Sequence, residues 1–163
     1  MGLTFPENTD ELVNQLFDDN NKGVDFVIFT MEGKETLVVQ DGHVGKGGRD
    51  KVEEILKENK DKIMTGCFLV LGVDDREVTV SIRRKYIQFI YVGEEVSGMA
   101  KARVVSQSGE LKNVFPSAHM NLQINEGDFS DLSEKDLERQ LRACGGAHQP
   151  TSYDFSCTAA DEA

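Results

Sequence analysis

The sequence contains no apolar stretch near the roughly 20 residues that a membrane-spanning helix needs. Its first residues, MGLTFPENTDEL, lack the basic segment followed by an apolar one that marks a secretory signal. Only three cysteines are present, Cys67, Cys144 and Cys157, and none belongs to a CxxC pair. We therefore expect a cytoplasmic chain with reduced thiols, in which Cys67 is a core residue and Cys157, in a polar segment, is the most reactive.

Basic residues are scarce relative to acidic ones. Lysine and arginine number 18 against 29 aspartates and glutamates, which gives a formal net charge of -11. Nucleic acids and anionic membranes are bound largely through lysine and arginine, so this balance argues against both as partners. A protein partner that meets a local basic patch is compatible with it.

Catalytic motifs, metal-binding motifs and cofactor fingerprints are also missing. The three histidines, His43, His119 and His148, are far apart in the sequence and lie in no recognisable motif. The glycine-rich segment 40–50 departs from phosphate-binding loops because Lys46 is followed by glycine rather than serine or threonine. We expect a binding protein with no catalytic residue, no cofactor and no metal. A small enzyme that uses His43 and this loop remains an alternative.

Hydrophobic periodicity predicts nine elements in the order helix, two strands, helix, two strands, long helix, strand, helix. The fold class expected from this order is α+β, with a central five-stranded sheet, mixed and mostly antiparallel, sandwiched by helices. We expect a single domain over residues 1–146. From residue 147 to residue 163 the sequence lacks periodicity, which predicts a flexible C-terminal tail.

The stretch from Lys85 to Arg103 reverses the acidic character of the chain. Residues 86–92 form a nearly unbroken apolar run, which predicts a strand buried on both faces. Ser97 can then cap a helix whose first turns carry Met99, Lys101 and Arg103. The two cations lie two residues apart and so point to different sides of the helix. They can flank a protein contact anchored by Met99, or be solvated beside a core methionine; the spacing leaves both open.

Two further expectations concern the same region. Arg83, Arg84 and Lys85 precede the apolar run and are either an exposed strand entry or a second contact patch. On the long helix, five apolar residues are expected to face the core: Ala102, Val105, Leu111, Val114 and Phe115.

Two segments resemble a known family. Residues 91–103, YVGEEVSGMAKAR, are similar to the strand-to-long-helix junction of the actin-depolymerising-factor homology (ADF/cofilin) family, in particular of its coactosin branch. Residues 141–148, LRACGGAH, are similar to the end of the last helix in coactosins. The resemblance implies the family's fold, an ADF-homology domain, and binding along the side of actin filaments without a nucleotide or metal.

The resemblance also implies a set of actin-contacting residues. Lys101 and Arg103 match basic residues of the long helix that faces actin, with Met99 as the adjacent apolar contact. Lys85 matches the lysine at the start of the fourth strand on which filament binding depends in coactosins. Four further implied contacts lie beside that lysine and on the last helix: Arg83, Arg84, Arg139 and Arg142.

The sequence departs from the family's pattern in three places. Residues 77–81 lengthen the hairpin before Lys85, and the N-terminus lacks the regulatory serine of cofilins. The segment beyond Ala147 is longer than expected for the family. A cofilin-like severing or depolymerising protein is the closest alternative, and a scaffold that has lost actin binding is a third. Weak binding of monomeric actin stays open, and we expect a monomer.

Overall fold

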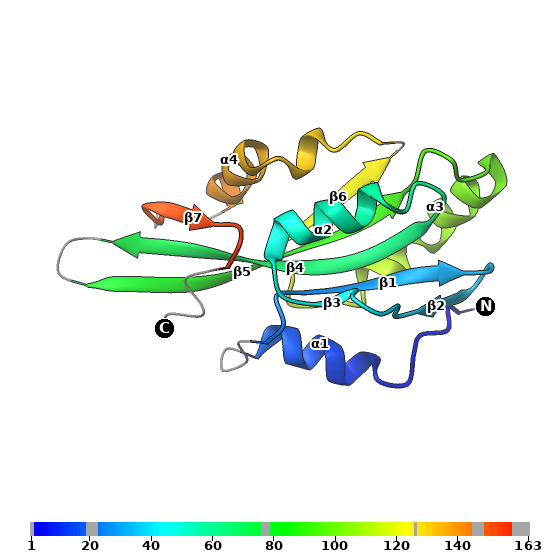
Figure 1. Cartoon of the computed structure of the whole chain (residues 1–163), viewed down its shortest axis with the longest axis horizontal. Coiled ribbons are helices and arrows are strands. Elements are labelled where there is room, and N and C mark those ends of the chain that lie inside the picture. Colours follow the sequence, from blue (N-terminus) through cyan, green and yellow to red (C-terminus); the bar gives the residue numbers. More distant parts are fainter. Residues whose placement is uncertain (1, 19–22, 76–78, 126, 145–148, 158–163) are drawn as a thin grey trace.

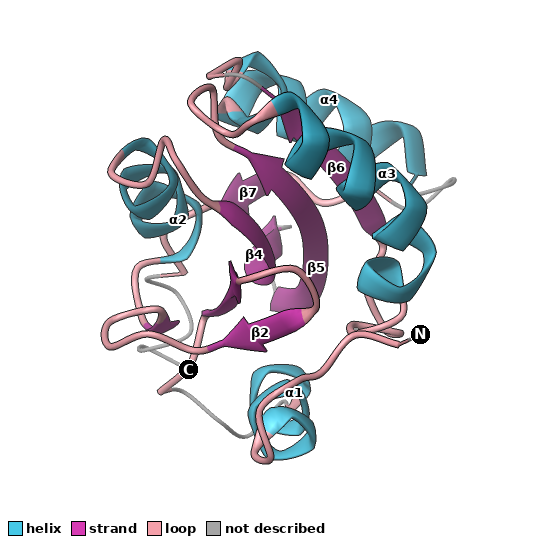
Figure 2. Cartoon of the chain, turned by 90° about the vertical axis from the view of Figure 1, so that its right-hand side faces the viewer, coloured by secondary structure: helices cyan, strands magenta, loops and turns pink. Residues whose placement is uncertain are grey.

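The computed structural model describes residues 2–18, 23–75, 79–125, 127–144 and 149–157. One twisted sheet forms the middle layer, and helices cover both of its faces (Figure 1, Figure 2). The expected α+β class, a mixed sheet sandwiched by helices, is therefore confirmed.

Five strands make up the main path of the sheet. In spatial order they are β2 (Thr36–Val38), β1 (Phe26–Glu32), β4 (Ile63–Asp75), β5 (Val80–Val92) and β6 (Met120–Asn125). Neighbours on this path are antiparallel except β5 and β6, which run parallel because a helix connects them. Two short strands that the sequence did not predict extend the sheet: β3 (Val44–Gly45) pairs with β1, and β7 (Ser152–Asp154) pairs with β4.

The helices divide between the two faces of the sheet. α1 (Thr9–Phe17) and α3 (Gly98–Lys112) contribute to one apolar core, and we call that side of the sheet the α1 face. α2 (Gly48–Lys57) and α4 (Glu134–Cys144), the latter preceded by the short helix η1 (Ser130–Leu132), contribute to the core on the opposite side, the α4 face. Both layers are visible edge-on in Figure 2.

Strand β5 is the centre of this arrangement. Every residue from Tyr86 to Val92 is buried, as predicted from the apolar run. Tyr86 and Ile90 belong to the core of the α1 face, whereas Ile87 and Phe89 belong to that of the α4 face. Because side chains of a strand alternate between faces, this register also fixes the face of each residue before Tyr86.

The C-terminal segment differs from the expected flexible tail. Ser152–Asp154 forms β7 against β4, and the side chains that follow are buried, with Phe155 7% and Cys157 1% exposed. The expectation is therefore wrong for residues 149–157; residues 147, 148 and 158–163 lie outside the described part. Cys157 was also expected to be the most reactive thiol, but Cys144 is the exposed one.

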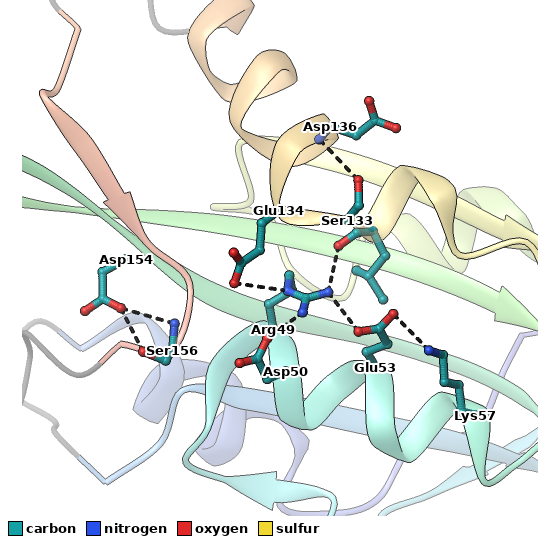
Figure 3. A network of polar contacts seen from close by, with 10 residues as sticks. Arg49, Asp50, Glu53, Lys57, Ser133, Glu134, Asp136, Asp154 and Ser156 are labelled. Atoms are coloured by element: carbon teal, nitrogen blue, oxygen red, sulfur yellow. Dashed lines mark hydrogen bonds and ion pairs between the residues drawn. The ribbon is translucent and has the colours of Figure 1, made fainter.

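Arg49 ties α2 to the start of α4 (Figure 3). Its side chain is 11% exposed and forms ion pairs with Glu53 at 3.0 Å and Glu134 at 3.9 Å. The guanidinium also donates a hydrogen bond to the carbonyl oxygen of Leu132 at 3.1 Å. The backbone N–H of Arg49 donates to the carbonyl of Phe155 at 3.0 Å, so one residue connects α2, η1, α4 and the C-terminal segment.

Candidate functional site

The start of α3 is positioned by a tight junction with β5. Gly93 follows β5 and leaves no room for a side chain, because a Cβ atom there would lie 2.0 Å from the carbonyl oxygen of Lys60. The backbone N–H of Glu95 donates to that same carbonyl at 2.9 Å. Ser97 then caps α3 as predicted, since its hydroxyl accepts the N–H of Ala100 at 3.2 Å. The buried strand thereby sets the direction in which α3 leaves the sheet.

The outward side of α3 presents two large apolar side chains to solvent. Met99 is 80% exposed and Val105 is 75% exposed, with the exposed Ala102 between them. Successive residues of a helix are about 100° apart, so Lys101 and Arg103 flank this strip on opposite sides. Both are half-buried. We call these five residues the α3 surface.

The sequence assigned part of this surface to the core. Val105 and Ala102 were expected to be buried, but Val104 is the valine that packs inward and is only 4% exposed. The expectation holds for Leu111 and Phe115, which are each 1% exposed. Because Val105 is exposed beside Met99, it joins the candidate contact residues that the sequence had missed.

A second group of cations lies on the hairpin formed by β4 and β5. This hairpin extends beyond β1, and we call its outer part, residues 70–75 and 80–85, the arm (Figure 1). Lys85 lies opposite Val70 and Arg83 lies opposite Gly72, which places both side chains on the α4 face. The structure thus places these two cations within β5.

Arg84 points to the other side of the arm. Its Nε donates to the hydroxyl of Tyr86 at 2.7 Å, and its guanidinium carbon lies 5.7 Å from the centre of that ring. The Nη2 of Arg84 donates to the carbonyl of Leu16, near the end of α1, at a distance of 3.2 Å. Arg84 therefore holds α1 against the sheet, and the strand separates it from Arg83 and Lys85. Its role as an actin contact stays a prediction.

The two arginines of α4 differ in their surroundings. Arg139 forms an ion pair with Asp136 at 3.5 Å, and its side chain is 69% exposed. Arg142 pairs with Glu138 at 2.9 Å, donates to the carbonyl of Pro150 at 3.1 Å and stacks on the ring of Tyr153 at 5.2 Å. Arg142 is thus bound to the C-terminal segment.

Arg142 shares a side of the molecule with the cations of the arm. Tyr153 lies opposite Gly72 in the sheet, and Gly72 lies opposite Arg83. Residues that pair directly across strands have side chains on the same face, so Tyr153 and the arginine stacked on it lie on the α4 face with Arg83 and Lys85. We call Arg83, Lys85 and Arg142 the arm surface. The arm and α3 lie towards opposite ends of the sheet (Figure 1).

His119 anchors the start of β6 next to the arm. Its Nδ1 accepts the backbone N–H of Tyr86 at 3.1 Å, and its backbone N–H donates to the carbonyl of Tyr86 at 2.8 Å. Burial, followed by the positive charge of Lys85, lowers the pKa of His119 below its usual 6.5. His119 therefore acts here as a neutral hydrogen-bond acceptor that fixes β6 beside β5.

We expect the free energy of unfolding to fall as the pH is lowered from about 7.5 to about 5.5. Burial lowers the pKa of both His43 and His119 in the folded chain, so the unfolded chain takes up protons first and acid favours it. The resulting stability is present above the unfolded pKa of about 6.5 and is lost as the pH falls below it. Denaturant unfolding at both pH values measures the change.

The matched variant replaces both histidines with asparagine. Asparagine does not titrate, and at position 119 its side-chain oxygen can still accept the N–H of Tyr86. We expect the variant to lose less stability than the wild-type chain over the same pH range. An equal loss in both proteins would show that other groups are responsible.

The enzyme alternative depends on His43 and the glycine-rich segment. His43 is 8% exposed, and its Nδ1 has no hydrogen-bond partner among the described residues. The backbone N–H of Gly47 donates to the carboxylate of Asp25 at 3.0 Å, which ties the glycine-rich segment to the residue before β1. Within the described ranges, no three histidine, cysteine or acidic side chains are grouped as metal ligands would be. His148 lies outside the described residues.

A membrane-crossing helix is not found either: none of the helices in the described part of the chain combines the length and the apolar character that this requires.

The fold and the sequence both have relatives among known proteins. Residues 2–142 match the family described as cofilin/tropomyosin-type actin-binding protein. Coactosin of Entamoeba histolytica is 29% identical over 147 residues, which is 90% of this chain and 90% of that protein. Its crystal structure has a TM-score of 0.73 at 26% identity and is matched over 90% of this chain and 99% of its own.

Two further coactosins are more distant. Coactosin of Dictyostelium discoideum is 25% identical over 134 residues, covering 82% of this chain and 85% of that protein. The solution structure of mouse coactosin, an actin filament binding protein, has a TM-score of 0.61 at 20% identity, with 90% of this chain and 95% of that one covered. At this low identity the likeness to the mouse protein shows the fold alone. The chain belongs to the cofilin/tropomyosin-type family of actin-binding proteins, and it is a coactosin-like member of that family.

Proposed function

We propose that the chain binds the side of actin filaments and modulates their dynamics without catalysing a reaction. The observation that carries this proposal is the α3 surface. It exposes Met99 and Val105 to solvent between two cations, in a chain whose formal net charge is -11. Large exposed apolar side chains beside charged ones are typical of a protein contact, because burying them in a partner removes apolar area from water.

The charge distribution supports an acidic partner. A chain with a strong negative charge is repelled by an acidic filament unless its cations face that filament locally. Lys101 and Arg103 on the α3 surface, and Arg83 and Lys85 on the arm, are the cations that we assign to this role. Mouse coactosin, which shares the fold, is described as an actin filament binding protein. The proposed location is the cytoplasm, at the actin cytoskeleton.

Co-sedimentation with purified actin filaments tests this function directly. We expect the chain to pellet with filaments in a saturable manner, and single filaments watched by fluorescence to keep their length without new breaks. Failure to pellet would contradict the proposal. Filaments that sever or shorten in the presence of the chain would instead support the cofilin-like alternative.

We expect Lys85→Glu to weaken pelleting at least about tenfold. A carboxylate in this position would repel an acidic filament where the lysine attracted it, and a like-charge contact of this kind costs more than the roughly 1.4 kcal/mol that corresponds to a factor of ten. Lys51→Glu is the matched control, because it makes the same change in net charge on α2, outside both surfaces. Equal pelleting of the two variants would remove Lys85 from the contact.

A further inference from the structure

The C-terminal segment lies along the edge of the arm, where β7 extends the sheet beside β4. Residues 149–157, which we call the strap, follow α4 and pair with β4 through Leu71, Gly72 and Val73 (Figure 1). A Cβ atom on Gly72 would lie 3.4 Å from the ring of Pro150, so Pro150 lies on the α4 face at the position opposite Arg83. Pro150 therefore covers the sheet next to a cation of the arm surface.

The outer half of the strap, residues 149–153, is bound to Arg142. The carbonyl of Pro150 accepts one nitrogen of the guanidinium at 3.1 Å, and the ring of Tyr153 lies 5.2 Å below its carbon. The side-chain amide of Gln149 donates to the backbone carbonyl of Arg142 at 2.9 Å. Glu138 is the charged partner of Arg142 among these contacts, and the partners in the strap are neutral. An acidic filament would offer carboxylates, which form stronger hydrogen bonds with a guanidinium than neutral groups do.

The inner half, residues 155–157, is anchored much more deeply. Phe155 belongs to the core of the α4 face, and Cys157, which is 1% exposed, donates from its thiol to the carbonyl of Leu69 at 3.1 Å. The carbonyl of Phe155 accepts the N–H of Arg49 at the start of α2 and leaves no space for a Cβ on Gly48. Thr151 and Ser152 in the outer half are exposed, so the two halves differ in the area that opening would uncover.

We propose that the outer half of the strap is a reversible cover that competes with the filament for Arg142 and the neighbouring face of the arm. The proposal rests on the proposed filament binding. In the closed state Arg142 is held by Pro150 and Tyr153. Opening of residues 149–153 breaks two of the three cross-strand pairs, those of Ser152 and Tyr153, and exposes the half-buried Tyr153 ring. The buried Phe155 and Cys157 keep the segment attached. The opened face then presents Arg83, Lys85 and Arg142 together.

A disulfide that locks the strap tests this directly. Val73 and Ser152 are paired across β4 and β7, and directly opposed residues have Cβ atoms close enough for a disulfide. Both side chains lie on the α1 face, behind the surface that the lock is meant to keep covered. The protein is Val73→Cys with Ser152→Cys in a Cys144→Ser background, which removes the exposed thiol.

The same protein, oxidised and reduced, gives the matched comparison. We expect the reduced form to pellet with filaments like the wild-type chain and the oxidised form to bind at least about tenfold more weakly. Equal binding of the two forms, with the disulfide verified by mass spectrometry, would overturn the strap proposal and leave filament binding intact. Failure of the wild-type chain to pellet would overturn the proposed function, and the role of the strap with it.

A second variant opens the strap instead of locking it. Tyr153→Ala removes the ring that stacks on Arg142, an interaction whose loss corresponds to a factor of about two to five. We expect filament affinity to rise by about that factor. Unchanged or weaker binding, in a variant whose circular dichroism spectrum matches the wild-type chain, would contradict the proposal.

Discussion

Reversing both cations of the α3 surface, Lys101→Glu with Arg103→Glu, is expected to reduce pelleting with actin filaments by at least about 100-fold. The two side chains flank an apolar strip with Met99 80% and Val105 75% exposed, so a partner that buries the strip also approaches both charges. Two carboxylates would then oppose an acidic surface at close range. A combined penalty near 3 kcal/mol suffices for the expected factor, and like-charge contacts at interfaces reach several kcal/mol.

The control variant makes the same kind of charge reversal at a different place on the molecule. Lys51→Glu with Lys57→Glu alters the net charge by the same amount on α2, which packs on the opposite face of the sheet from α3 (Figure 2). We expect this control to pellet at most a few-fold more weakly, through the general increase in repulsion. If the two double variants bind equally well, the α3 surface does not contact the filament.

The largest effect on stability is expected from Gly93→Ala. The added Cβ would lie 2.0 Å from the carbonyl oxygen and 2.4 Å from the carbonyl carbon of Lys60, both of them backbone atoms that cannot rotate away. The loop before β4 or the start of α3 must then move. Gly93 is buried, its N–H donates to the carbonyl of Lys62 at 3.0 Å, and the N–H of Glu95 donates to that of Lys60 at 2.9 Å, so this movement would disturb both bonds. We expect the free energy of unfolding to fall by about 3 kcal/mol or more, measured by denaturant titration.

Gly98→Ala is the comparison, five residues further along the chain. No atom lies within 4 Å of the Cβ that it would add, and the position begins α3, where alanine is favoured over glycine. We expect its stability to equal or slightly exceed that of the wild-type chain. A Gly93→Ala variant as stable as Gly98→Ala would show that the junction between β5 and α3 can rearrange without cost.

Much of the fold could be predicted because its signals are local. The apolar run 86–92 predicts a strand buried on both faces, and Ser97 is a helix cap whose bond to Ala100 depends only on nearby residues. The long helix was harder to orient. Val104 and Val105 differ by one residue and about 100° of rotation, and the choice between them depends on how α3 meets the sheet.

The features that the sequence missed depend on contacts between distant segments. β7 pairs with residues 71–73, about 80 positions earlier in the chain, and the strap carries only two strongly buried side chains, Phe155 and Cys157. So short a pattern in a polar segment does not reveal a strand. The sequence did show the cluster of Arg83, Arg84 and Lys85. Because side chains alternate along a strand, Arg84 lies on the opposite face from the other two, where it donates to a carbonyl of α1.

Strand β5 runs without interruption from the arm to the start of α3. This strand of thirteen residues, which spans roughly 40 Å, begins in the arm and ends at the junction that starts α3, so the two cationic surfaces are connected through one stiff element. The number of residues between Lys85 and the start of α3 therefore sets the distance between these two points. If the proposed function holds and both surfaces contact the filament, spacing as well as charge would be a criterion of recognition.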